Sequence, residues 1–383
     1  MKKEELGIYI HIPFCKKKCY YCDFISYCNK SEFVDDYIKC LKNEIINFAQ
    51  RHKDIYDITT IYIGGGTPSS IEEKHIKDII DTIDENLVKI KDIKEITIEV
   101  NPGTITKQKL EQYKSSGINR ISIGLQSTNN KLLEEIGRIH NFDEFLETYN
   151  MARKVGFKNI NVDLMLGLPN QTINDLSDSI NEIIKLNPEH ISIYSLILEE
   201  NTVLYNLVEE GKLTLPTDEL ERNMYWYVKN KLELNNYNHY EISNFAKEGY
   251  ESKHNWNCWE QKQYVGFGTS AHSYLKDKRF SNTENLEQYI NNIENNNIQK
   301  NYIIHENQDI EDKKKEYMLL GLRKVEGVSI QKFKNKFKDN PIYLFRNELQ
   351  KLIEEGLLEI DGDNIRLTNK GLDLANIVWE EFV

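Results

Sequence analysis

Apolar and polar positions alternate between two patterns along the first 210 residues of the chain. Short runs rich in isoleucine and valine are followed by longer stretches in which apolar residues recur at helical spacing. These patterns predict strands at Ile8–Ile12, Thr60–Ile63, Glu95–Val100, Arg120–Leu125, Asn159–Met165 and His190–Leu196, and helices at Glu32–Gln50, Glu72–Glu85, Lys107–Ser116, Asp143–Val155 and Ile173–Leu186.

The predicted strands are nearly continuously apolar, which is typical of a parallel sheet that is buried on both faces. Right-handed crossovers curl such a sheet toward a barrel. Six repeats are fewer than the eight of a closed barrel, so we expect an α/β fold with an open, partial (β/α)6 barrel. Prolines follow four of the strands and mark the loops at the carboxyl edge, where barrel sites form; they are Pro13, Pro68, Pro102 and Pro169.

The pattern changes after residue 210. We predict a barrel at 1–210, an aromatic-rich and less regular connecting region at 211–300, and a C-terminal domain at 301–383. The last part has three helical runs, a hairpin around Asp361-Gly362-Asp363 and a final helix, an order that resembles a winged helix. A DNA-binding regulator is disfavoured, because the net charge is −12 and the helix expected at Ile342–Glu355 is acidic.

Composition places the chain among soluble globular proteins, with 39% hydrophobic and 29% charged residues. No apolar run is long enough for a transmembrane helix, and the first residues lack the apolar core of a signal peptide. Six cysteines in such a chain indicate metal ligands and spare thiols rather than a disulfide framework. We therefore expect a cytoplasmic protein.

Three of the cysteines, Cys15, Cys19 and Cys22, have the spacing C-x3-C-x2-C. A structural zinc ion takes four protein ligands, and an electron-transfer 4Fe–4S cluster takes four thiolates. A zinc site completed by His11 or by a distant ligand stays open, and a disulfide is disfavoured. The spacing resembles that of radical SAM enzymes, and this resemblance implies a 4Fe–4S cluster whose open iron binds the amino and carboxylate groups of S-adenosylmethionine (SAM).

Polar side chains interrupt the strands near their carboxyl ends. Glu99, Gln126 and Asp163 lie in otherwise apolar runs, where an unpaired polar group costs about 1–3 kcal/mol. We interpret them as ligand contacts, although pairing inside the barrel would also satisfy them. The glycines of Gly64-Gly65-Gly66-Thr67-Pro68 allow a ligand close to the backbone, and Arg138 could pair with a carboxylate or lie solvated at the surface.

Several motifs together resemble the oxygen-independent coproporphyrinogen III oxidase family over essentially the whole chain. They are Tyr9-Ile-His-Ile-Pro-Phe-Cys15, Gly64-Gly-Gly-Thr-Pro68, Gly124-Leu-Gln126, Asp163-Leu-Met-Leu-Gly-Leu-Pro169, Tyr240-Glu-Ile-Ser-Asn-Phe-Ala246 and Gly266-Phe-Gly-Thr-Ser-Ala-His-Ser273. The resemblance implies that Cys15, Cys19 and Cys22 bind the cluster. It places SAM among Tyr9, Gly65, Gly66, Thr67, Glu99, Gln126, Arg138 and Asp163.

This family has two branches. The dehydrogenases, which decarboxylate two propionates of coproporphyrinogen III, resemble C-x3-C-x2-C-x-C and have a longer segment before the cluster. Here Phe24 occupies the fourth cysteine position, and fourteen residues precede Cys15. The Asp23-Phe24 pair is similar to the heme chaperones of the HemW type, so we favour a chaperone and keep the dehydrogenase, then an unrelated radical SAM activity, as alternatives.

The chaperone branch also carries an H-N-x-x-Y-W motif associated with heme. The corresponding segment here is His254-Asn-Trp-Asn-Cys-Trp259, so Cys258 replaces the tyrosine. A neutral imidazole is a good axial ligand and tryptophan packs on a porphyrin, which makes His254 the predicted heme ligand. A hydrogen-bonded histidine in an aromatic core is the alternative.

The resemblance further implies a recipient hemoprotein as partner, and the net charge of −12 leads us to expect no nucleic-acid partner. The resemblance leaves open a homodimer, a transient membrane association and the cleavage of SAM.

Overall fold

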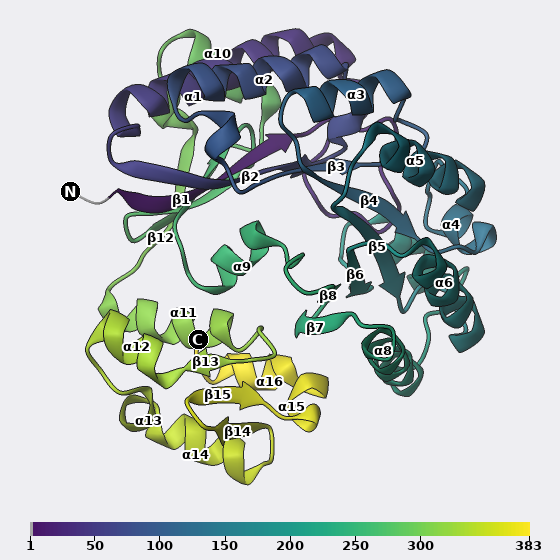
Figure 1. The fold of residues 1–383 in the computed structure, drawn as a ribbon, viewed down its shortest axis with the longest axis vertical. Helices are drawn as coiled ribbons and strands as arrows, with labels where there is room; N and C mark the ends of the chain where they lie inside the picture. The colour runs from purple at the N-terminus through teal and green to yellow at the C-terminus, as the bar shows by residue number, and fades with distance from the viewer. Residues whose placement is uncertain (1–2) are drawn as a thin grey trace.

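The computed structural model describes residues 3–383. A twelve-stranded sheet with the order β12-β11-β10-β9-β1-β2-β3-β4-β5-β6-β8-β7 forms its centre, and helices cover the outer face (Figure 1). The six central strands are all parallel, which confirms the predicted partial barrel. They are β1 (Glu4–Ile12), β2 (Tyr56–Gly65), β3 (Glu95–Val100), β4 (Arg120–Gln126), β5 (Ile160–Leu166) and β6 (His190–Ser195).

The helices that follow these strands lie close to the predicted ranges. Helix α6 (Ile173–Leu186) begins and ends where the sequence pattern does, and Thr172 caps it through a capping box. The others on this face are α1 (Val34–His52), α2 (Glu73–Asn86), α3 (Lys107–Ser115), α4 (Asn130–Glu135), α5 (Phe142–Val155), α7 (Val203–Glu209), α8 (Asp218–Glu233) and α10 (Leu286–Glu294).

The central strands are not apolar on both faces, contrary to the expectation from sequence. Successive side chains of a strand point to opposite faces, and on β3 Ile96 and Ile98 join the hydrophobic core beneath the helices. Thr97 and Glu99 face the concave side instead, where Glu99 accepts a hydrogen bond from Tyr62 of β2. The outer face is therefore the hydrophobic core and the inner face is a buried polar surface.

Residues 238–307 contribute strands to both edges of this sheet, so the last of these strands lies beyond residue 300. Strand β9 (Tyr264–Phe267) is parallel to β1, and three antiparallel strands extend that edge: β10 (His272–Leu275), β11 (Lys278–Asn282) and β12 (Tyr302–Asn307). Strands β8 (Asn244–Ala246) and β7 (Asn238–Glu241) extend the edge beside β6. The predicted division at residues 210 and 300 stays a prediction.

Helix α9 (Lys253–Trp259) lies on the concave side of the sheet (Figure 1). The buried carboxylate of Glu95 accepts hydrogen bonds from the backbone amides of Lys253 and His254 at 3.0 and 3.1 Å. A carboxylate at a helix amino terminus satisfies free amides and suits the helix dipole. Glu95 thus fixes α9 to the amino-terminal part of β3.

The C-terminal part has its own hydrophobic core and the predicted winged-helix-like order. Its three-stranded sheet has the order β13-β15-β14; β13 follows the first helix, and the helix expected at Ile342–Glu355 is interrupted at Phe345. The elements are α11 (Ile310–Gly321), β13 (Val328–Ser329), α12 (Ile330–Phe337), α13 (Pro341–Leu344), α14 (Arg346–Glu354), β14 (Leu358–Asp361), β15 (Asn364–Leu367), α15 (Asn369–Asp373) and α16 (Ala375–Glu380).

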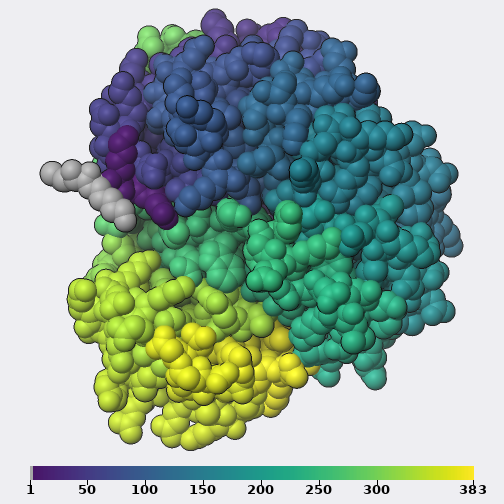
Figure 2. Space-filling model, in the orientation of Figure 1, coloured from purple at the N-terminus to yellow at the C-terminus, as the bar shows by residue number. Residues whose placement is uncertain are grey.

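This domain packs against the barrel through α9 (Figure 2). The guanidinium of Arg323 lies over the rings of Trp259 and Trp379, at 4.5 and 4.8 Å from their centroids. Next to it, the buried ammonium of Lys324 pairs with Glu260 at 2.6 Å. Cation–π contacts strengthen when desolvated, so this cluster joins α9 firmly to the C-terminal domain.

None of the helices within residues 3–383 combines the length and apolar character needed to cross a bilayer.

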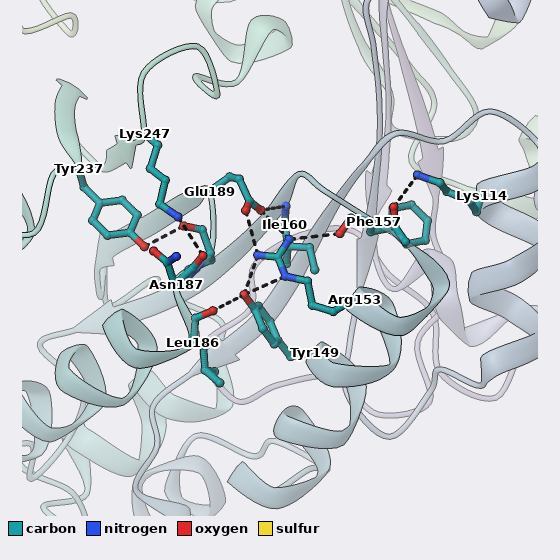
Figure 3. Close-up of polar contacts among 12 residues, drawn as sticks. Lys114, Tyr149, Arg153, Phe157, Ile160, Leu186, Asn187, Glu189, Tyr237 and Lys247 are labelled. Carbon is teal, nitrogen blue, oxygen red and sulfur yellow. Dashed lines mark hydrogen bonds and ion pairs between the residues drawn. The ribbon is translucent and has the colours of Figure 1, made fainter.

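A polar cluster holds the amino-terminal ends of β5 and β6 against α5 (Figure 3). Arg153 pairs with Glu189 at 2.8 Å and also donates to the hydroxyl of Tyr149 at 2.7 Å. Glu189 accepts from the backbone amide of Ile160, and Tyr149 donates to the carbonyl of Leu186. The side chains of Arg153 and Glu189 are 27% and 15% exposed, so water screens this pair weakly.

Replacing Glu189 with alanine should lower the free energy of unfolding by about 3 kcal/mol, because it leaves a half-buried guanidinium and a strand amide unpaired. Urea denaturation measures the change. The matched control is Glu182→Ala, which breaks the more exposed pair with Lys185 and should cost less than about 1 kcal/mol. Equal effects of the two substitutions would show that the cluster has no special structural role.

Candidate functional site

A cavity of about 410 Å³ opens at the carboxyl ends of the central strands. It collects the three cysteines of the C-x3-C-x2-C loop and seven of the eight residues that the sequence analysis assigned to SAM. These lining residues are Cys15, Cys19, Cys22, Gly65, Gly66, Thr67, Glu99, Gln126, Arg138 and Asp163.

The cysteine loop follows β1 and is held by backbone hydrogen bonds on both sides. The amide of Cys15 donates to the carbonyl of Tyr27 at 3.0 Å, and the amide of Thr67 donates to the carbonyl of Phe14 at 2.9 Å. The amide of Tyr20 donates to the carbonyl of Ile136, beyond β4. The loop is therefore braced between the ends of two different strands, with its thiols at the cavity.

Two glycines where β2 ends are required by close packing. Gly65 has a φ of +110°, and a Cβ there would lie 2.6 Å from the ring of His11. A Cβ on Gly66 would lie 3.0 Å from the Sγ of Cys15. Only glycine combines this φ with the missing Cβ, so the glycine run brings the second strand against the cysteine loop.

Arg138 connects the thiols with the third and fourth strands. Its guanidinium donates to the Sγ of Cys19 at 3.3 Å, to the Oδ1 of Asn101 at 2.8 Å and to the carbonyl of Gly124 at 2.6 Å. The Nε of Arg138 is buried and has no partner among the residues that the structure describes. A fixed guanidinium with a spare donor suits a carboxylate or a thiolate.

Two carboxylates face the cavity opposite the thiols. Glu99 accepts from the hydroxyl of Tyr62 at 2.8 Å and from the amide of Gly65 at 3.3 Å. Desolvation, with a smaller contribution from the charge of Asp163, raises the pKa of Glu99 to about 7. Asp163 accepts from Ser122 and Asn161, and burial raises its pKa as well. A cationic ligand would relieve the cost of ionising both groups.

Gln126 ends β4 in a conformation that few residues other than glycine adopt. Its φ is +77°, and the pairing of β4 with β5 shifts register between Gly124 and Gln126. Bulges and positive φ values concentrate at binding sites, because they redirect a side chain at the cost of strain. The bulge here precedes the side chain that lines the cavity.

Tyr9 is the predicted SAM residue that does not line the cavity. Its hydroxyl bonds to the Nδ1 of His11 at 2.9 Å, and its ring stacks on Tyr62. The sequence analysis did not identify several other residues that line the cavity, which lie at alternate positions of the strands or just after them. Inward alternation from Glu99 and Asp163 would have found two members, Asn101 and Met165, of the set, which is Tyr62, Asn101, Ser122, Met165 and Tyr194.

The donor set fits an iron–sulfur cluster that has three protein ligands. Thiolates are the preferred ligands of such clusters, and three thiols line one wall of one cavity. Phe24, at the fourth cysteine position of the dehydrogenase pattern, also lines the cavity and is 65% exposed. The carboxylates and Arg138 on the facing walls suit a ligand that carries both an ammonium and a carboxylate.

The predicted heme ligand His254 lies elsewhere, near the amino-terminal ends of the strands. It is 6% exposed, its Nδ1 bonds to the hydroxyl of Thr60 at 2.9 Å, and its ring packs on Tyr62. Burial raises the pKa of the Cys258 thiol to about 12, so this thiol is protonated at neutral pH. Trp256 and Thr60 line a second cavity of about 670 Å³ at this end of the barrel.

Comparisons with known proteins agree with this geometry. Residues 9–183 match the radical SAM superfamily model, and residues 309–374 match the HemN C-terminal domain model. The chain is 41% identical to the heme chaperone HemW of Bacillus subtilis over 98% of each chain. It is 37% identical to the heme chaperone HemW of Lactococcus lactis over 100% of this chain and 98% of that one.

Among solved structures, the chain is similar to the coproporphyrinogen III oxidase HemN of Escherichia coli, a radical SAM enzyme. The TM-score is 0.85 at 23% identity, with 99% of this chain and 90% of that chain covered. This similarity shows the shared fold.

Replacing Glu99 with glutamine should stabilise the ligand-free protein above pH 7. Because burial raises the pKa of Glu99 to about 7, the folded state loses stability as pH rises from the unfolded-state pKa toward 7. The variant should therefore exceed the parent by up to about 3 kcal/mol at pH 8 and match it below pH 4.5. Urea denaturation across this range measures the difference, and Glu85→Gln on the exposed face of α2 is the control. A pH-independent difference would contradict the assignment.

Proposed function

The chain belongs to the HemW heme chaperone family of radical SAM proteins, and on this premise we propose that it binds heme and passes it to a recipient hemoprotein. The similarity to heme chaperones over nearly the full length of both chains carries this proposal. The cavity supports it, because its three thiols and its exposed Phe24 follow the pattern of the chaperone branch.

We propose that Cys15, Cys19 and Cys22 hold the 4Fe–4S cluster that the radical SAM family carries. When bound, the cluster supplies an iron with an open coordination site and one-electron chemistry. The hydrogen bond between Cys15 and Thr67, at 3.4 Å, and that from Arg138 to Cys19 stabilise thiolates at two of these positions. Such contacts to sulfur also raise the reduction potential of a cluster.

We propose that the facing walls of the cavity orient SAM. Glu99 and Asp163 provide negative charge for its ammonium and sulfonium groups, and the spare donor of Arg138 suits its carboxylate. The strained backbone of Gln126 turns an amide side chain toward the same space. Gly65 and Gly66 allow a ligand to approach the backbone closely, and the hydroxyl of Thr67 holds the Sγ of Cys15 by a hydrogen bond.

The contact between His254 and heme stays a prediction. Trp256 and Tyr240 provide aromatic walls in the second cavity. Its charged lining is balanced, with Lys94, Lys253 and Lys262 against Glu5, Glu251 and Glu326, so charge alone does not select propionates. Because the Nδ1 of His254 bonds to Thr60, iron would bind its Nε2, but the ring is buried against Tyr62 and does not line the second cavity. Binding of heme iron there therefore needs side chains at the amino-terminal ends of the strands, which we call the barrel floor, to rearrange.

The alternative activity is the oxidative decarboxylation of coproporphyrinogen III. The overall fold favours it equally, since the structural neighbour is an oxidase of that substrate. The exposed phenylalanine at the fourth cysteine position and the much higher identity to the chaperones favour heme handling.

Replacing Cys15, Cys19 or Cys22 with alanine should abolish the brown absorbance of the anaerobically reconstituted protein, because two thiolates hold a 4Fe–4S cluster poorly. Iron and sulfide content, with the EPR signal of the reduced cluster, measure the loss. Cys40→Ala, in the core beneath α1, is the control and should keep a full cluster. Retention of four irons in the triple variant would refute the assignment.

The reconstituted protein should form a complex with ferric heme that survives gel filtration, and an apo-hemoprotein should then remove the heme. Under anaerobic conditions with SAM and a reductant, it should produce no protoporphyrinogen from coproporphyrinogen III. Absorption spectra follow the transfer, and chromatography of the tetrapyrroles follows turnover. Robust turnover would overturn the chaperone proposal in favour of the dehydrogenase.

A further inference from the structure

Only two of the nine histidines, His272 and His305, are exposed. Six others are less than 9% exposed, and His52 is intermediate. Because all nine lie within residues 3–383, this comparison covers every histidine of the chain. An exchangeable heme needs an imidazole that the iron can reach without unfolding its surroundings.

The two exposed histidines form a pair across the strands that extend the sheet beyond β1. His272 begins β10 and His305 lies in β12, and their rings stack with centroids 5.2 Å apart and planes at 13°. The hydroxyl of Ser281, on the intervening strand β11, bonds to the Nε2 of His305 at 2.8 Å. Neither ring nitrogen of His272 has a hydrogen-bond partner among the residues that the structure describes.

A β-bulge places His305 in this pair. The pairing of β11 with β12 shifts between Arg279 and Phe280, which lie opposite Glu306 and Ile304, so His305 is the extra residue. Bulges at sheet edges redirect a side chain and recur next to functional sites. Ser281 pairs with His272 on one side and with Ile303 on the other, so these side chains share one face of the sheet.

This face is also close to the cysteine loop. Burial, chiefly, and the nearby His272 lower the pKa of His11 to about 4, and the Nε2 of His11 bonds to the carbonyl of Ile25, next to Phe24. On the same face Ile303 is 45% exposed, which offers an apolar surface to a porphyrin. His272 therefore shares a sheet face with the exposed Ile303 and lies near His11, whose ring is bonded to the segment that follows the cysteine loop.

We propose that His272 is the axial ligand through which this protein captures heme iron, and that His305, held by Ser281, positions it. The proposal rests on the proposed heme-chaperone function and specifies the contact. One coordination bond forms between an imidazole nitrogen and iron, and a water molecule leaves the metal. The ring of His305 stacks on a face of the His272 ring and so does not cover the ring edge that carries the nitrogens.

The same reasoning disfavours His254 as the capturing ligand. His254 is 6% exposed and its ring packs on Tyr62, so iron reaches its Nε2 only if the surrounding side chains move. His272 breaks none of its own hydrogen bonds on ligation, and its exposed position allows heme to be passed on. A chaperone needs a ligand that both binds and releases its cargo.

The test uses the full chain, purified without a histidine tag and reconstituted with its cluster, and titrated with ferric heme under anaerobic conditions. EPR of the ferric heme, in which the oxidised cluster is silent, reports the axial ligand. His272→Gln should lose the signature of histidine ligation and raise the Kd at least about tenfold. His305→Gln should keep that signature with a smaller loss of affinity, and His52→Gln, the matched control, should behave as the parent.

A ligand exchange guards against misfolding. His272→Met should keep heme bound but replace the histidine signature with that of methionine ligation, which a merely destabilised protein cannot produce. Parent protein that binds no heme would refute the proposed function itself. Parent protein that binds heme while His272→Gln and His272→Met leave the spectrum unchanged would overturn this inference alone, and loss of the signature in His254→Ala would then place the ligand at the barrel floor.

Discussion

The structure depends on one constraint: polar side chains on the inner face of a parallel sheet are buried and must find partners within the barrel. A continuous path of hydrogen bonds meets it. The amide of Ser252 donates to the hydroxyl of Tyr240, which bonds to the Nε2 of His190 at 2.7 Å. The Nδ1 of His190 bonds to Asn161, and Asn161 donates to Asp163 in the cofactor cavity.

This path explains why the barrel floor and the cofactor cavity form one unit. Strong burial lowers the pKa of His190, so the ring is neutral and can donate at one nitrogen and accept at the other. Glu95 adds a second connection by capping α9. The segment that resembles a heme motif is thereby built into the support of the cavity that the cysteine loop lines. Through Trp259 and Arg323 it also contacts the C-terminal domain.

The interior of the barrel and the outer strands suit different ligands. The buried polar interior is rigid and suits a cofactor that stays bound, whereas the strands beyond β1 present accessible imidazoles at an edge. Cargo that must be released gains from such a site, because binding and release need no opening of the core. His11 connects the two regions, because it lies just before the cysteine loop and its Nε2 bonds to the carbonyl of Ile25, just after that loop.

The sequence by itself determined the six central β/α units, the cysteine loop and seven further residues that line the cofactor cavity. Periodicity and spacing are local, so Glu95–Val100 and Ile173–Leu186 were predicted to the residue, and parallel strands bring their carboxyl ends to one edge whatever their contacts. Tertiary structure alone decided which strand positions point inward, the pairing of β9 with β1 and the burial of His254. It also decided that His272 and His305, distant in sequence, stack. Those outcomes depend on contacts between segments that are distant in sequence. Short strands and single side chains carry too little sequence pattern to predict such contacts.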